Sequence, residues 1–187
     1  SGTTAGTVTI AGVETLNLIA GAVKATLAGV TTTSATAATI SGGTKLTVTA
    51  ALEGGIKSID GSASTGGFDI QLNPDSVVTV TGGSGNDTVN VATNLDSLFT
   101  LDGGDGTDTL EISDASDITK TNVAGISNFE TLSAIGRDSD DYDADLISGI
   151  TKLVAAAASG ANDVTFKNVT AANSDVLVTG TEGVILT

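Results

Sequence analysis

A repeat of 21 residues constrains the fold of this chain more than any other feature. Three consecutive segments align without a gap: IDGSASTGGFDIQLNPDSVVT from Ile59, VTGGSGNDTVNVATNLDSLFT from Val80 and LDGGDGTDTLEISDASDITKT from Leu101. A fixed period of this length is typical of solenoid proteins, in which each repeat forms one coil that packs on its neighbours. The matched positions are Gly61, Gly82 and Gly103; Phe68, Val89 and Leu110; Ile70, Val91 and Ile112; and Asp75, Asp96 and Asp117.

Each repeat contains two short strand-like pieces, such as TVNVA and SLFTL, separated by turn residues. The pieces alternate apolar and other residues and are rich in β-branched types, which favours strands. Glycine-rich turns lie on one side and NPDS or NLDS on the other. The pattern therefore predicts an all-β fold, a parallel β-solenoid with coils of about 21 residues, in which Val89 lies over Leu110 and Val91 over Ile112.

The repeat extends more loosely beyond its clearest region, residues 59–121. We expect one elongated solenoid over residues 1–187, with further strands at 45–50, 163–169 and 175–180. Similar segments around Glu14-Thr15-Leu16 and Glu130-Thr131-Leu132 suggest a second module that starts near residue 122. The segment 143–160 fits either a helical turn or a strand. Because the chain does not begin with Met, we expect it to be part of a longer protein.

The composition limits the chemistry that is open to this chain. It has no Cys, His, Met or Trp, one Tyr and four Phe. A thin core of Val, Leu, Ile and Ala is expected, without disulfides, thiolate metal sites or His-based catalysis. The chain is therefore predicted not to be an enzyme. No apolar run approaches the ~20 residues that span a bilayer, so it is also predicted not to be transmembrane.

The net charge of −15 comes from 22 acidic and seven basic residues. Such a surface repels nucleic acid and anionic lipid, so no nucleic-acid partner is expected. It attracts divalent cations instead.

The sequence Gly-Gly-x-Gly-x-Asp occurs twice in register, in TGGSGNDTVNV and DGGDGTDTLEI. Ca²⁺ requires six to eight oxygen ligands, and a glycine-rich turn can offer carbonyl oxygens beside a carboxylate. Two stacked turns could share one ion. The alternative is an ordinary pair of glycine turns with solvated Asp. The predicted ligands are the carboxylates of Asp87 and Asp108 and the carbonyls of Gly83, Gly85, Gly104 and Gly106, with Asp102 and Asp105 as further candidates.

Two other segments bear on metal binding. The coil at 59–79 has Gly66 where the next two coils have Asp87 and Asp108, so it is expected to turn without binding an ion. The acidic segment RDSDDYDADL contains Asp141, Asp143 and Asp145 at alternate positions. It lacks the glycine and the terminal glutamate of an EF-hand loop. The segment is therefore expected to form either a solvated acidic loop or a weaker Ca²⁺ site.

The stretches GGSGNDTV and GGDGTDTL resemble the nonapeptide G-G-x-G-x-D-x-U-x of the RTX (repeats-in-toxin) family. The resemblance implies that each stretch forms a Ca²⁺-binding turn and that Val89 and Leu110 point into a β-roll. RTX nonapeptides follow one another directly, whereas the two copies here stand 21 residues apart.

The wider texture, in segments such as TLNLIAG, GGTKLTVTAAL and ISNFETLSAIG, resembles RTX-type surface-layer proteins of Gram-negative bacteria. The resemblance implies type I secretion, an extracellular location on the cell surface, and Ca²⁺-dependent self-assembly with lattice neighbours as partners. Cell-surface polysaccharide would be bound through regions outside this chain. The alternatives are a repeat module of a secreted RTX adhesin and the C-terminal RTX part of a secreted enzyme.

Overall fold

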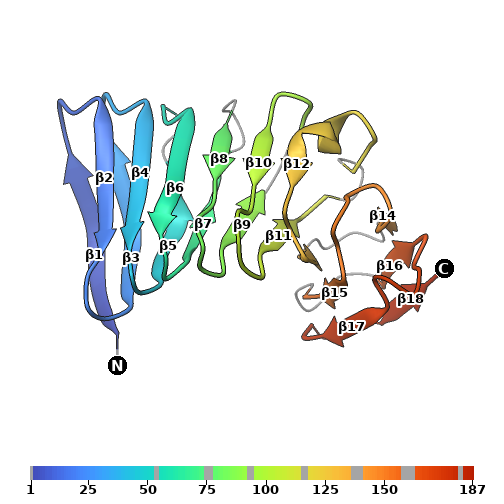
Figure 1. The fold of residues 1–187 in the computed structure, drawn as a ribbon. Helices are drawn as coiled ribbons and strands as arrows, with labels where there is room; N and C mark the ends of the chain where they lie inside the picture. Colours follow the sequence, from blue (N-terminus) through green and yellow to red (C-terminus); the bar gives the residue numbers. More distant parts are fainter. Residues whose placement is uncertain are drawn as a thin grey trace.

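The chain folds as a solenoid of parallel strands, with about seven turns spaced roughly 22 residues apart. The computed structural model describes residues 2–52, 55–73, 78–91, 95–114, 118–135, 141–156, 163–180 and 183–187. The coils follow one another in a row from the N-terminus to the C-terminal region (Figure 1). The predicted all-β parallel solenoid is confirmed.

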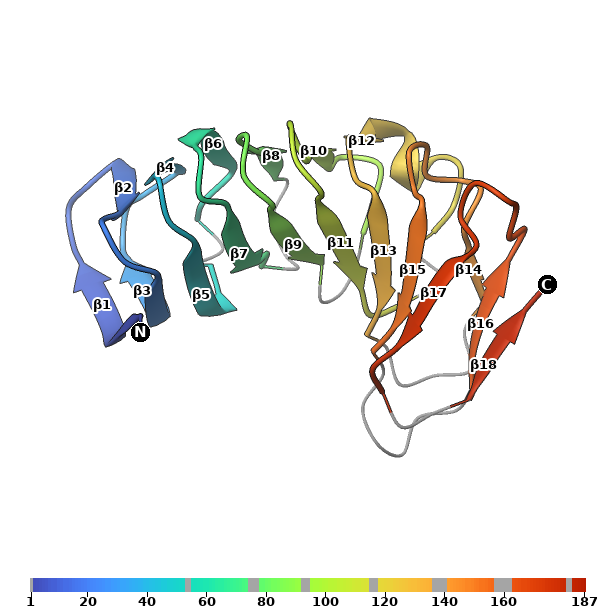
Figure 2. The same ribbon diagram turned by 60° about the horizontal axis from the view of Figure 1, so that its bottom comes forward.

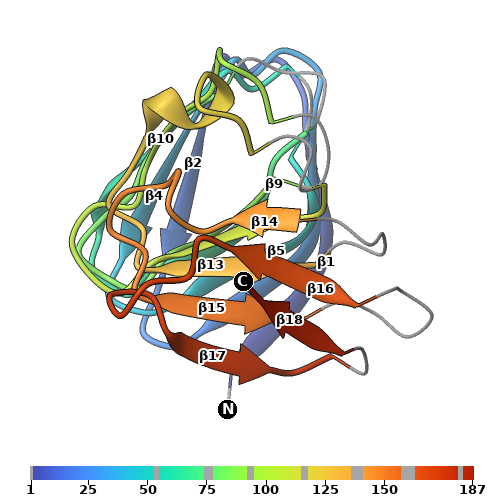
Figure 3. The same cartoon turned by 90° about the vertical axis from the view of Figure 1, so that its right-hand side faces the viewer.

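Two parallel sheets run along the stack, and a third lies at its C-terminal end (Figures 1 and 3). The nine-stranded sheet contains β1 (Thr3–Ile10), β3 (Ala25–Thr32), β5 (Leu46–Ala51), β7 (Phe68–Gln71), β9 (Thr88–Val91), β11 (Thr109–Ile112), β13 (Thr131–Ala134), β15 (Lys152–Ala155) and β17 (Asp175–Val178). The six-stranded sheet contains β2 (Thr15–Ala20), β4 (Ala37–Gly42), β6 (Ser58–Ser64), β8 (Thr79–Thr81), β10 (Thr100–Asp102) and β12 (Ile126–Ser127). The third sheet contains β14 (Asp141–Asp143), β16 (Val164–Lys167) and β18 (Val184–Leu186).

Odd-numbered strands pair only with odd-numbered strands of the neighbouring coils, as Figure 2 shows for β1 to β17. Val89 pairs with Leu110 and Val91 with Ile112, as the repeat predicts. In the six-stranded sheet, Ile59 pairs with Val80 and Val80 with Leu101. These pairs keep the 21-residue period on both sheets.

The predicted match of Phe68 with Val89 is wrong. Ile70 pairs with Val89, so this pairing is shorter than the period by two residues. Phe68 instead stands over Leu46 of the preceding coil, and its fully buried ring packs against Gly61. A side chain at residue 61 would overlap that ring. The glycine at this position therefore leaves the space that the ring of Phe68 fills.

Alternation along each strand builds a continuous aliphatic core. Val89, Leu110, Leu132 and Leu153 are fully buried and stacked, each on the corresponding strand of the next coil. Burial of one such side chain contributes about 1.5–3 kcal/mol, so the column holds adjacent coils together. The core is not purely aliphatic, contrary to the prediction from the composition, because all four Phe and Tyr142 are also buried in it.

Most of the other predicted strands form. The piece at 45–50 overlaps β5, the pieces at 163–169 and 175–180 contain β16 and β17, and the ambiguous segment 143–160 contains β15. SLFTL is a strand only from Thr100 onward. The similar segments around Thr15 and Thr131 lie in different sheets. No helix among the described residues is long and apolar enough to span a membrane.

Candidate metal centre

Three acidic residues stack at the starts of consecutive strands in the nine-stranded sheet. Thr88, Thr109 and Thr131 pair in register, and the residue before each is Asp87, Asp108 and Glu130 respectively. Asp87 is 1% exposed and Asp108 is fully buried. We call Asp87, Asp108 and Glu130 the acid column. The predicted juxtaposition of Asp87 and Asp108 on adjacent coils is therefore present.

Backbone N–H groups bind the carboxylates of the acid column. Asp87 accepts hydrogen bonds from the N–H of Phe68 at Oδ1 and of Gly83 at Oδ2, both at 2.8 Å. Asp108 Oδ1 accepts the N–H of Asp87 at 2.7 Å, and Glu130 Oε2 accepts the N–H of Asp108 at 2.8 Å. Hydrogen bonds to charged acceptors are stronger than neutral ones, so each acid ties its own coil to the preceding coil.

Asp108 Oδ2 is buried without a hydrogen-bond partner. Burial, together with the negative charges of Asp87, Glu130 and Asp102, raises the pKa of Asp108 to about 7, against the opposing effect of the hydrogen bond from the N–H of Asp87. Burial also raises the pKa of Asp87, against the N–H groups of Gly83 and Phe68 and the charge of Lys45. A buried carboxylate with one oxygen lacking a hydrogen-bond partner is unfavourable among like charges, and a cation would relieve this.

This observation fits a cation at Asp108, but the donors around it are incomplete. Among the described residues, no three acidic side chains converge on a point where they could hold a metal ion. Both carboxylate oxygens of Asp87 already accept N–H groups. Asp108 Oδ2 is therefore the carboxylate oxygen that is best placed to receive a cation.

The glycines of the two motifs lie where adjacent coils come closest. A Cβ on Gly82 would overlap the carbonyl oxygen of Gly103, and a Cβ on Gly83 or Gly85 would overlap the backbone of the preceding coil. Gly104 and Gly106 have positive φ angles of 87° and 140°. Coil packing therefore accounts for the glycines by itself, with or without an ion.

The further candidates, Asp102 and Asp105, differ in their surroundings. Asp102 Oδ1 accepts the N–H of Gly104 at 3.1 Å and the side-chain amide of Asn128 at 2.7 Å. Asp105 is exposed at the corner of its coil. In the coil at 59–79, Gly66 packs against the backbone of Thr44, where a Cβ would overlap it.

The acidic segment 137–146 does not form one cluster among its described residues. Asp141 pairs with Lys167. Asp143 accepts the N–H of Asp145 at 3.1 Å and the side-chain amide of Asn168 at 2.8 Å, and Asp145 is exposed. Asp138 lies outside the described residues, as do the repeat positions Asp75 and Asp117.

Three participants were missed by reasoning from the sequence. Glu130 completes the acid column, and its signal was the shared pattern of an acid, Thr and an aliphatic residue. Asn128 and Asn168 each bind an Asp of the preceding coil from a backbone with φ near 56°, a conformation in which Asn is enriched. The spacing of these two Asn residues carried no signal, because it follows neither the motif nor the 21-residue period.

Comparisons of this chain with protein-family models, with curated proteins and with solved structures find no match.

Proposed function

We propose that this chain is a non-catalytic structural module of a secreted surface-layer protein that assembles in the presence of Ca²⁺. The observation that carries the proposal is the placement of exposed apolar side chains at the two ends of the solenoid. Among described residues, the large exposed apolar residues are Val8, Ile19 and Val23 near the first coil, Leu177, Val178, Ile185 and Leu186 in the last coils, and Leu98 between them.

Solenoids need polar terminal coils to remain soluble as separate units. Here β1 is exposed along its whole length except at Ile10, which is partly buried, and only one of its edges pairs with a neighbouring strand, β3. Ends of this kind suit contact with another protein surface, which is either a further coil of a longer chain or a neighbouring copy. The alternative of an adhesin repeat module draws on the same observation, because tandem modules also cover one another's ends.

Charge would control such contacts. The net charge of −15 opposes the approach of two copies, and salt screens it over ~10 Å at 0.1 M. Divalent ions that bridge carboxylates on neighbouring molecules would reverse this repulsion. Bridging acids would come from the segment Asp138 to Asp145, of which Asp145 is exposed and Asp141 and Asp143 are engaged with Lys167 and Asn168.

Within one molecule, Ca²⁺ is proposed at the acid column and the glycine corner beside it. Asp108 Oδ2 would supply a ligand, with Asp87, Asp102 and Asp105 and the motif carbonyls as the other candidates. The bound ion supplies positive charge among buried carboxylates. Folding would then be coupled to the metal, so that a chain kept extended at low Ca²⁺ for secretion folds outside the cell.

Electron microscopy of the purified protein in millimolar Ca²⁺, in Mg²⁺ and in chelator tests the proposal. Ordered sheets are expected in Ca²⁺ alone, because Mg²⁺ retains its waters and demands octahedral geometry. Sheets of equal order in chelator would contradict the role of Ca²⁺. A protein that stays monomeric in Ca²⁺ would contradict self-assembly and favour the adhesin alternative.

A further inference from the structure

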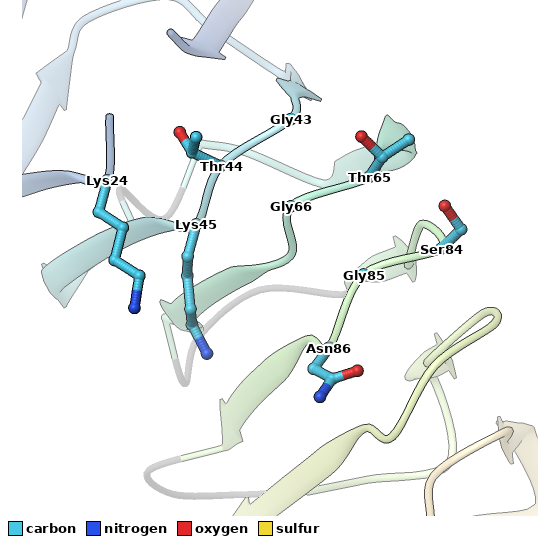
Figure 4. Close-up of a pocket in the computed structure, with 9 residues that line it drawn as sticks. All are labelled: Lys24, Gly43, Thr44, Lys45, Thr65, Gly66, Ser84, Gly85 and Asn86. Carbon is cyan, nitrogen blue, oxygen red and sulfur yellow. The ribbon is translucent and has the colours of Figure 1, made fainter. Parts of the chain in front are cut away.

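We infer that a polar groove on one corner of the solenoid binds an acidic oligosaccharide. The groove has a volume of about 630 Å³, within the range of ligand sites. It crosses four successive coils, and its lining includes Lys24, Lys45, Thr65, Ser84 and Asn86 (Figure 4). We call it the lysine groove. The proposal does not depend on Ca²⁺ or on assembly.

The fold places the two lysines side by side. Ala25 pairs with Leu46, so the preceding residues, Lys24 and Lys45, occupy equivalent positions on adjacent coils. The N–H of Ala25 donates to the carbonyl of Lys45 at 3.0 Å, which fixes the backbones about one strand spacing, ~4.8 Å, apart. Figure 4 shows both side chains extending in the same direction, toward the side on which the amide of Asn86 lies.

Neither lysine forms an ion pair with a described residue. Among the described residues, the ion pair present joins Lys167 and Asp141. Lys45 interacts at longer range with Asp69, Asp87 and Glu111, whose pKa values it lowers against the effect of burial. These three carboxylates offset part of the charge of Lys45, but none of them forms an ion pair with it, so its ammonium group keeps its hydrogen-bond donors for a ligand. Two such cations on one groove, in a chain with seven basic residues and a net charge of −15, form a local site for anions.

The remainder of the lining indicates the class of the anion. Thr65, Ser84 and Asn86 are exposed polar residues, and no aromatic or aliphatic side chain lines the groove. Asn86 Oδ1 accepts the N–H of Thr107 at 3.1 Å, which orients the amide and presents its NH₂ group as the donor. An apolar ligand would leave these groups unpaired, whereas the hydroxyls of a sugar can pair with them.

The direction of the groove distinguishes a chain from a single ion. Its lining comes from residues 24, 43–45, 65–66 and 84–86, and therefore lies along the solenoid axis. The lysines occupy one end of this path, and the Ser84 and Asn86 side chains the other. A linear oligosaccharide with carboxylates on its sugars can place acidic groups on the lysines and neutral hydroxyls on the other end at the same time.

Calorimetric titration with oligogalacturonate, in chelator and at low ionic strength, tests this inference. Maltotetraose tests the need for charge, and inorganic phosphate tests whether any small anion suffices. The Lys24→Gln, Lys45→Gln double variant removes two charges from the groove. The Lys57→Gln, Lys120→Gln double variant is the matched control, because it removes two exposed charges elsewhere.

We expect oligogalacturonate to bind, maltotetraose not to bind, and phosphate to compete only weakly. The groove variant should lose roughly tenfold or more in affinity, while the control stays within about twofold. Circular dichroism should show that both variants keep the wild-type fold. The groove variant should melt somewhat lower, because Lys45 no longer offsets the charges of Asp69, Asp87 and Glu111, so binding is compared below both midpoints. Absence of binding, equal losses in both variants, or full competition by phosphate would each overturn the inference.

Discussion

At the scale of single residues, Asp108 connects the stability of the fold to pH. Its pKa is raised from 3.8 to about 7 in the folded state. Between these two pH values, the folded protein therefore holds a proton that the unfolded chain has already released. Stability must therefore fall as pH rises from about 4 to about 7, and the loss is complete above that range. Burial raises the pKa of Asp87, Asp69 and Glu111 in the same direction.

We predict that, in chelator, the thermal midpoint rises when pH is lowered from 8 to 5. Asp108→Asn should flatten this dependence and raise the midpoint at pH 8, because the amide keeps an oxygen for the N–H of Asp87 and carries no charge. The control is Asp175→Asn, at an exposed residue of β17. Scanning calorimetry at several pH values measures both. If Asp108→Asn keeps the wild-type slope, the buried charge at Asp108 is not its source.

At the scale of elements, the glycine corners determine how closely two coils approach. Gly82 lies against the carbonyl of Gly103, and Gly103 lies against the carbonyl of Asn128 one coil further on. A methyl group in this row must push the coils apart, and the hydrogen bond from the N–H of Gly82 to the carbonyl of Asp102, at 2.7 Å, would lengthen with it.

We predict that Gly82→Ala destabilises the protein by about 3 kcal/mol or more, since overpacking commonly costs 1–3 kcal/mol and the contact here is with backbone. Gly6→Ala is the control, because a Cβ at Gly6 meets nothing within 4 Å. That change should be neutral or slightly stabilising. Urea unfolding in chelator measures both free energies, and a Gly82→Ala variant as stable as Gly6→Ala would show that the coils can separate without cost.

The elements also show which features of the fold were readable from the sequence. The 21-residue period identified the solenoid and the pairing of Val89 with Leu110, because alternation and turn residues repeat together there. It failed at Phe68, where one coil is paired two residues out of period. That shift depends on a ring filling the space over Gly61, which only the packed structure reveals. At the site, the motif placed Asp87 and Asp108 together but did not show that backbone N–H groups bind their carboxylates.

At the scale of the whole molecule, apolar surface and charge act against each other. The two ends of the stack expose aliphatic side chains, while the net charge of −15 keeps copies apart. Association is then expected only where cations suppress the repulsion, because the apolar ends supply a short-range attraction at any ionic strength.

The apolar ends yield the last prediction. Val8 on the first coil is 37% exposed and Val178 on the last is 49% exposed, although each pairs with a buried core residue of the adjacent coil, Val30 and Ala155 respectively. Val8→Gln and Val178→Gln should each weaken self-association in Ca²⁺ by roughly tenfold, since burying one such side chain contributes about 1.5–3 kcal/mol. Leu98→Gln is the matched control, because Leu98 is 58% exposed but lies midway along the stack. Sedimentation velocity across a concentration series measures the association constants.

Weakening by Leu98→Gln equal to that of the end variants would place the contact on the side of the solenoid. Weakening by only one end variant would indicate that like ends meet, whereas equal weakening by both is expected if the first coil of one copy stacks on the last coil of the next.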